Sequence, residues 1–163
     1  MSSLHRQERL LDIAGAGNPE ELRKLREEEQ NRLASVLSSS PVIQVIEELN
    51  ELHDAVIVRI LELAEIELAR SGFGKPPVPY AYLLFGSGGR SEQTMSSDQD
   101  SGIVYGVPEN GAEAERCCRY FRSLGRLVVE RLVETGYLPC EGNVIASNPD
   151  WCLSIVDWEQ KLD

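Results

Sequence analysis

The sequence predicts an α+β protein, with a helical N-terminal part followed by a part in which strands and helices alternate. Two observations support this class. Apolar residues recur at helical spacing over 18–72, and two short apolar runs, 80–85 and 101–105, lie on either side of a glycine-rich turn. The proline-rich stretch 74–79 between the two parts cannot be helical, and we expect it to be an extended connector.

The first helices have clear start signals. Residues 1–17 carry little pattern and are predicted to be a flexible or loosely docked start. Asn18 can then cap a helix and Pro19 suits its first position, so we predict a helix that continues to Ser38.

A second, longer helix follows at once. Ser40 can act as its cap and Pro41 as its first residue, and the helical spacing of apolar residues continues to Gly72.

After the connector, the pattern alternates between short strands and helices. The run 80–85 and the segment 99–105 are predicted strands, and 113–135 is a helix that ends at Gly136. The residues 143–146 are predicted as a third strand. A last helix is predicted to begin at Ser147-Asn148-Pro149 and to continue to the end of the sequence.

Composition and charge narrow the class of function. The chain has 163 residues, of which 42% are hydrophobic, which suits a folded domain of ordinary size. Its formal net charge of −11 argues against a broad nucleic-acid footprint, because that surface needs basic residues to replace phosphate counterions. No apolar run reaches the roughly 18–20 residues of a membrane span, and the N-terminus lacks a signal-peptide core. We therefore expect a cytoplasmic protein without membrane or nucleic-acid partners.

The four cysteines do not indicate a structural metal. They lie at positions 117, 118, 140 and 152, with no CxxC pair and with both histidines far away in sequence. We expect reduced thiols in and near the core. A structural zinc site and a disulfide between the two adjacent cysteines are the weaker alternatives.

The stretch 86–100, GSGGRSEQTMSSDQD, carries the most chemistry. Successive side chains of a strand alternate between its faces, so Asp98 and Asp100 are expected to point the same way. Two carboxylates on one face suit Mg²⁺, which is typically held by one or two carboxylates together with substrate phosphates.

The glycine turn complements the acid pair. Without side chains, Gly86, Gly88 and Gly89 let backbone N–H groups wrap an anion, and the Ser87 hydroxyl adds a donor. The guanidinium of Arg90 suits a phosphate. A P-loop is the weaker alternative, because no lysine stands at the required place after the first glycine. The combination predicts a site for a nucleoside triphosphate and a divalent cation.

The segment GSGGRSEQTMSSDQDSGIVY resembles the GSxGRxEQTxxTDQDN-type signature of the DUF294 family of nucleotidyltransferases. The similarity extends back into the long helix, through Leu49-Asn50 and Arg59, and forward to GNVIASNPDW at 142–151. That family belongs to the DNA polymerase β-like nucleotidyltransferase superfamily and is related to the PII protein uridylyltransferase. The resemblance covers roughly residues 20–163.

The resemblance implies a fold and a set of roles. It implies a polymerase β-like core, a small mixed sheet flanked by helices, over 74–163, after a helical segment at 18–73. Asp98 and Asp100 would hold one or two Mg²⁺ or Mn²⁺ ions and Arg90 the developing charge. The glycine turn and Ser87 would hold the phosphates of the nucleotide.

The chain also departs from the family pattern. Active members of the superfamily usually add a third carboxylate from a later strand, and 143–146 contains no acid; Glu141 and Asp150 are the nearest candidates. Family members commonly continue into a further helical domain, so we expect a truncated chain or a lone module. Two hypotheses follow: a nucleotidyltransferase that modifies a signalling protein similar to PII, and a catalytically silent nucleotide-sensing or partner-binding module with the same fold.

Overall fold

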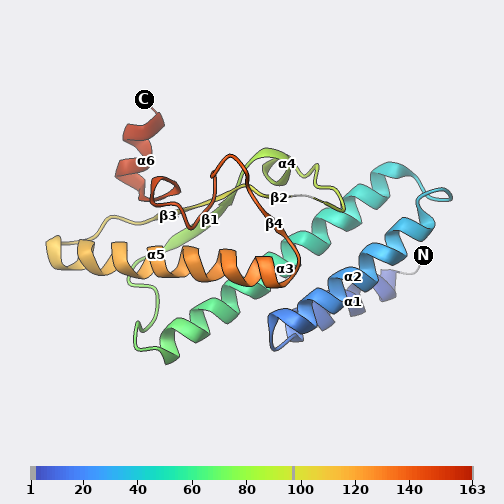
Figure 1. Ribbon diagram of the computed structural model, residues 1–163, viewed down its shortest axis with the longest axis horizontal. Coiled ribbons are helices and arrows are strands. Elements are labelled where there is room, and N and C mark those ends of the chain that lie inside the picture. Colours follow the sequence, from blue (N-terminus) through green and yellow to red (C-terminus); the bar gives the residue numbers. More distant parts are fainter. Residues whose placement is uncertain (1–2, 97, 163) are drawn as a thin grey trace.

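The computed structural model describes residues 3–96 and 98–162 and confirms the α+β class, with helices first and a small mixed sheet after them (Figure 1). The helices are α1 (Ser3–Gly15), α2 (Pro19–Val36), α3 (Val42–Arg70), α4 (Gly86–Gly89), α5 (Gly111–Glu134) and α6 (Ile155–Leu162), with a short 3-10 helix, η1, at Pro149–Trp151. The strands are β1 (Tyr80–Leu84), β2 (Asp98–Gln99), β3 (Ser101–Tyr105), β4 (Leu138–Pro139) and β5 (Cys152–Ser154).

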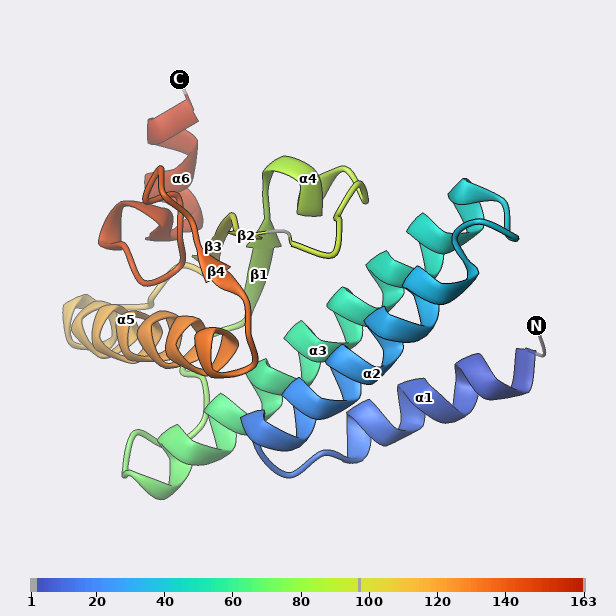
Figure 2. The same ribbon diagram turned by 45° about the vertical axis from the view of Figure 1, so that its right-hand side comes forward.

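Helices α1, α2 and α3 pack together as a helical layer, and α5 joins this layer to the sheet (Figure 2). Helix α5 contacts α3 on one side and β3 on the other. The buried face of α5 includes Tyr120, Phe121 and Leu124, and Phe121 stacks on Tyr105 of β3 with 4.6 Å between ring centroids. The core is therefore continuous from the helices to the sheet.

Several predicted helix ends are confirmed. The Asn18 side chain accepts the N–H of Glu21 at 3.0 Å, and Pro19 is the first residue of α2. Asn110 caps α5 in the same way, and Gly136 follows the end of α5 with a φ of 97°. The connector 74–79 is free of helix, as its prolines require.

The start of the chain differs from the prediction. Residues Ser3–Gly15 form α1 where sequence analysis expected a flexible or loosely docked start, and Ile13 is fully buried. The other large apolar residues of α1 are Leu4, Leu10 and Leu11, of which Leu4 and Leu11 are exposed, so they form no regular apolar stripe that periodicity could reveal. The proposed cap Ser40 was also wrong, because the N-cap of α3 is Pro41 and no side chain caps it.

The C-terminal segment differs as well. Residues 143–146 were predicted as a strand, but 143–144 have no regular structure and a bend and a turn follow at Ile145 and Ala146, which are both buried. Two hydrogen bonds connect this segment to Ser101: the Ser101 N–H donates to the Val144 carbonyl at 3.0 Å, and the Ala146 N–H donates to the Ser101 Oγ at 3.2 Å. Instead of one long helix, the last residues form η1, β5 and α6 in turn.

The three-stranded sheet has the order β1-β3-β5, with β1 antiparallel and β5 parallel to β3. The predicted strand 99–105 is interrupted at Asp100, which separates β2 from β3. Strand β2 pairs in parallel with β4 rather than with the main sheet. This pairing brings the residues after α5 next to the acid pair.

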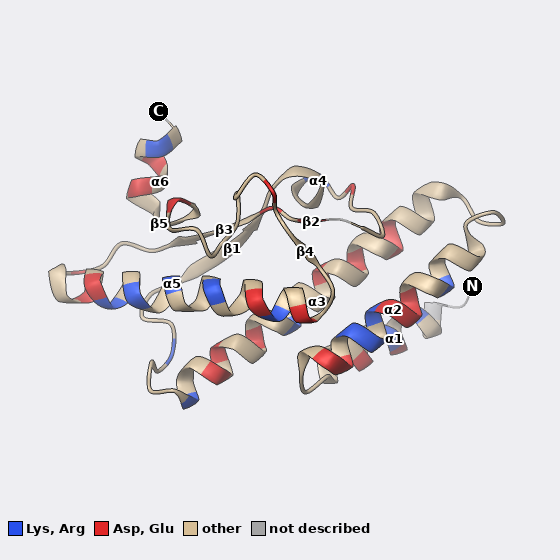
Figure 3. Cartoon of the chain, viewed as in Figure 1, with Lys and Arg blue, Asp and Glu red and all other residues tan. Residues whose placement is uncertain are grey.

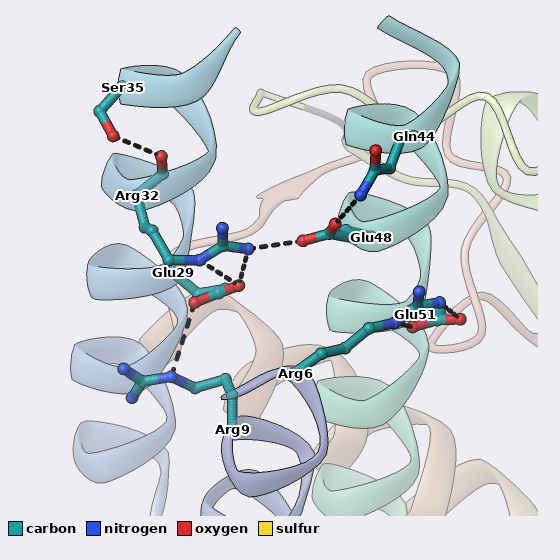
Figure 4. Close-up of polar contacts among 8 residues, drawn as sticks. All are labelled: Arg6, Arg9, Glu29, Arg32, Ser35, Gln44, Glu48 and Glu51. Carbon is teal, nitrogen blue, oxygen red and sulfur yellow. Dashed lines mark hydrogen bonds and ion pairs between the residues drawn. The ribbon is translucent and has the colours of Figure 1, made fainter. Parts of the chain in front are cut away.

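A network of ion pairs connects the three N-terminal helices (Figure 4). Arg32 of α2 pairs with Glu29 on its own helix and with Glu48 of α3, the latter at 2.7 Å. From α1, Arg9 lies 3.6 Å from Glu29. Arg6 of α1 pairs with Glu51 of α3. These contacts fix α1 in place, although only one of its side chains is deeply buried in the apolar core.

Within the described residues, no helix combines the length and the apolar character needed to cross a membrane.

Candidate functional site

Asp98, Asp100 and Cys140 lie together at the edge of the sheet. Ligand atoms of the three side chains are all within 4.8 Å of one another. Asp98 is exposed, and the other two are half-buried. The expectation that the two aspartates point the same way agrees with this geometry.

The parallel pairing of β2 with β4 explains why these residues meet. Asp98 is opposite Leu138 and Gln99 is opposite Pro139. The same register, continued by one residue, brings Cys140 beside Asp100. The thiol is hydrogen-bonded to the Asp100 carboxylate, and burial together with this bond raises the pKa of Cys140. In the absence of a cation the group is therefore a neutral thiol.

The glycine turn touches the acid pair. It forms the single-turn helix α4, and Gly86 at its start has a φ of 52°, in the left-handed region that favours glycine. A Cβ at this position would overlap the Asp100 carboxylate. The Phe85 N–H also donates to the Asp100 carbonyl at 2.9 Å. Phosphate-binding and metal-binding candidates are thus direct neighbours in space.

The remaining turn residues are close to solvent. Ser87 and Gly88 are half-buried and Gly89 is exposed. A Cβ on Gly89 would lie 2.7 Å from the Leu84 carbonyl oxygen, so this position also requires glycine. Arg90 is exposed and its Nε donates to Glu92 at 2.8 Å. In the structure Arg90 therefore faces Glu92 rather than the acid pair.

A small cavity of about 20 Å³ adjoins the acid pair. Asp98, Asp100, Gln93, Gln99 and Gly88 are among the residues that line it. A cavity of this volume holds about one water molecule, so a nucleotide would lie outside it, over the exposed turn. The cavity is notable for buried amides, because Gln93 Oε1 and both amide atoms of Gln99 make no hydrogen bond to the described part of the chain.

Helix α3 holds the loop that links the turn to the acid pair. The Asn50 side chain donates to the Ser91 carbonyl at 2.8 Å and accepts the Gln93 N–H at 3.2 Å. The fully buried His53 lies 3.1 Å from the Thr94 carbonyl through Nε2. The sequence alone did not indicate that the long helix supports the site.

His53 has a defined proton arrangement. A carbonyl can only accept, so Nε2 carries the proton and Nδ1 accepts the Tyr137 hydroxyl hydrogen at 2.7 Å. Burial is the main cause that lowers the pKa of His53 to about 4. The imidazole is therefore a neutral structural link between α3, the loop and the segment after α5.

The third residue near the acid pair is neither of the two acids considered from the sequence. Within the described chain, Glu141 and Asp150 are outside the group of possible ligands, and Cys140 takes the third place. Sequence analysis missed Cys140 because β4 is only two residues long and includes a proline. The one signal available was its position four residues after the helix-ending Gly136.

The arrangement suits a divalent cation. Across the described residues, no arginine or lysine forms an ion pair with Asp98 or Asp100. Two adjacent carboxylates without a counter-charge repel each other, and a cation between them removes that repulsion. Oxygen ligands of this kind are those that Mg²⁺ and Mn²⁺ prefer. The residues present therefore fit a bound divalent ion.

Comparison with known proteins adds a family to this geometry. A family model described as "Putative nucleotidyltransferase DUF294" matches residues 28–163. No curated protein and no solved structure matches the chain.

Proposed function

The chain belongs to the DUF294 family of nucleotidyltransferases, and from that premise we propose that it transfers a nucleoside monophosphate from a nucleoside triphosphate to an acceptor with the help of Mg²⁺ or Mn²⁺. The observation that carries this proposal is the close packing of Gly86 against the Asp100 carboxylate. A phosphate chain held by the glycine turn would lie directly beside a cation held by Asp98 and Asp100.

Each part of the site has a proposed task. Asp98 and Asp100 hold the cation, and Ser87 with the N–H groups of the turn binds the β- and γ-phosphates. When bound, the cation supplies positive charge to the attacking and leaving oxygens at the α-phosphate. Arg90 stabilises the developing negative charge. Its exposed pair with Glu92 contributes at most about 1 kcal/mol, so the side chain can turn toward the nucleotide at little cost.

We further propose that the acceptor is a protein, by analogy a signalling partner similar to PII. Acidic and basic residues are interspersed over the helices (Figure 3). Helix α5 does carry a row of exposed arginines, at positions 116, 119, 122 and 126. A row of four falls short of the roughly 6–10 phosphate contacts typical of nucleic-acid binding, in a chain with a net charge of −11.

The first test is calorimetric titration of ATP, UTP, GTP and CTP into the protein, with and without Mg²⁺. We expect one nucleotide to bind in a metal-dependent manner and the double variant Asp98→Asn/Asp100→Asn to lose that binding. Asp150→Asn is the matched control, because Asp150 is an exposed aspartate outside the ligand group. Equal binding by the wild type and the double variant would refute the proposal.

A second candidate function is a regulatory module that binds a nucleotide or a partner without turnover. It is favoured by the ligand group itself, in which, among the described residues, the third member beside the two aspartates is Cys140 and not a third carboxylate. Transfer of label from an α-labelled nucleoside triphosphate to a protein would exclude this alternative. Metal-dependent binding without any label transfer would support it.

A further inference from the structure

We propose that Cys140 Sγ is a third protein ligand of the cation site, so that Asp98, Asp100 and Cys140 also bind a zinc-class, thiophilic divalent cation. This inference rests on the proposed use of the two aspartates as metal ligands. It adds a sulfur ligand to the two carboxylates. The sulfur ligand changes which metals the site prefers.

The distances are compatible with a shared ion. Zn–O bonds of about 2.0–2.2 Å and a Zn–S bond of about 2.3 Å place the ligands of a tetrahedral site roughly 3.3–3.8 Å apart. The ligand atoms of the three side chains are already within 4.8 Å of one another. Side-chain shifts of about 1 Å close the remaining gap, and side-chain torsions can supply them without backbone movement.

The position of the thiol is set by the fold. Strand β4 pairs with β2 and ends directly before Cys140. The thiol contacts the Asp100 carboxylate, and a Cβ on Gly142 would lie 3.6 Å from its sulfur. The other three cysteines are outside the ligand group. The parallel pairing of β2 with β4 thus places the thiol of Cys140 beside Asp98 and Asp100.

A second, independent observation indicates a hydrated ion at this place. Gln93 is 5% exposed, and its Oε1 has no donor in the described chain although it lines the same cavity as both aspartates. A buried acceptor without a protein donor needs a water molecule. A water bound to a cation is polarised and is therefore a strong donor for such an acceptor.

The donor set predicts how different metals behave. Two carboxylates and one thiolate give three protein ligands and leave a fourth position open, which is the pattern of reactive rather than structural zinc sites. Mg²⁺ is a hard ion that prefers oxygen ligands to sulfur, so only the two carboxylates bind it. A zinc-class ion uses all three and therefore binds more tightly than Mg²⁺ and competes with it.

The test uses Co²⁺ as a spectroscopic substitute for Zn²⁺. Co²⁺ is titrated into the wild type, Cys140→Ser and Cys118→Ser, and the sulfur-to-metal charge-transfer band in the near ultraviolet is recorded. Zn²⁺ affinity is then measured by displacement of Co²⁺, and Mg²⁺ affinity by calorimetry. Cys118→Ser is the matched control, since Cys118 is another half-buried thiol but lies on α5 outside the ligand group.

We expect the band in the wild type and in Cys118→Ser, and its loss in Cys140→Ser. The Zn²⁺ affinity of Cys140→Ser should fall about tenfold or more, since even residues outside the ligand shell can contribute that much. Its Mg²⁺ affinity should stay within about twofold, because the carboxylates remain. The variant Cys140→Asp should also lose the band but bind Mg²⁺ more tightly, because it supplies a third oxygen ligand.

The outcomes separate this inference from the proposed function. Mg²⁺ binding that depends on the aspartates, with Zn²⁺ affinity and the spectrum unchanged in Cys140→Ser, would overturn the inference and leave the function standing. A wild type that binds none of these ions would overturn both. Loss of the band in Cys118→Ser instead would place the thiol ligand elsewhere and would likewise overturn the inference.

Discussion

At the scale of single residues, Gly86 decides whether the turn and the acid pair can meet. Its φ of 52° favours glycine, and its missing Cβ leaves the space that the Asp100 carboxylate fills. The absence of a Cβ at Gly86 therefore permits both the left-handed backbone of the turn and the position of the Asp100 carboxylate.

Gly86→Ala should impair both stability and metal binding. The left-handed backbone costs an alanine about 1–3 kcal/mol, and the methyl group displaces Asp100 from its position beside Asp98. We expect a lower midpoint in urea unfolding and weaker Mg²⁺ binding by calorimetry. Gly111→Ala is the control, because a Cβ there meets no atom within 4 Å. Normal Mg²⁺ affinity in Gly86→Ala would contradict this account of the site.

The sequence revealed these residues unequally. The prediction of Asp98, Asp100 and the glycines depended on local patterns, an acid pair two residues apart and a glycine-rich turn, and the structure places Gly86 beside Asp100. Cys140 was not predictable, because its role depends on a two-residue parallel pairing that leaves no periodic signal. A ligand contributed by a distant segment requires the tertiary structure.

At the scale of elements, α3 acts as the support for the loop between the turn and the acid pair. Asn50 and His53 are one helical turn apart and hold the backbone at Ser91, Gln93 and Thr94. Helix α2 adds a fourth contact, from the Gln30 side chain to the Met95 carbonyl at 3.1 Å. The helical layer therefore shapes the site without contributing a ligand.

The buried His53 should make stability depend on pH. Its pKa is about 4 in the folded protein against 6.5 in the unfolded chain, so the unfolded state binds more protons between these values. The free energy of unfolding should therefore fall with decreasing pH, by about 2 kcal/mol from this residue between pH 7 and pH 5. Urea unfolding of the wild type and His53→Gln across this window measures it. Equal pH slopes in the two proteins would contradict the assignment.

The helices were predicted better than the short strands for a physical reason. Apolar periodicity over many residues identifies α2, α3 and α5, and Asn18 also marks the start of α2 as its cap. The segment 143–146 carries strand-like residues, yet two hydrogen bonds to Ser101 connect it to β3, while Cys152–Ser154 takes the third place in the sheet. For segments this short, strand pairing depends on which segment competes successfully for a place beside β3. The strand propensity of the residues does not determine that outcome.

At the scale of the whole molecule, ion pairs add to the apolar contacts through which the N-terminal helices associate. Arg32 lies between Glu29 and Glu48, whose side chains are each only 7% exposed. The periodic pattern could predict the two long helices but not this polar connection, because apolar spacing carries no information about which charged residues form pairs.

Arg32→Met should lower stability by about 3 kcal/mol, because it removes the cation that lies between the buried carboxylates of Glu29 and Glu48. Added salt should reduce the loss by screening their repulsion. Unfolding in urea at low and high salt measures both effects. Arg23→Met is the control, since Arg23 forms an exposed pair with Glu27 on one helix and should change stability by less than about 1 kcal/mol. A loss of similar size in both variants would show that the network adds no specific stability.

The pairing of β2 with β4 also has a consequence for the order of folding. Strand β3 and the whole of α5 separate the two strands in sequence, whereas α1, α2 and α3 follow one another directly along the chain and contact one another. Distant contacts must first overcome the entropy of closing the intervening chain, and so they form slowly. We therefore expect the junction of Asp100 with Cys140 to be among the last to assemble, so that cation capture during refolding would signal a finished molecule.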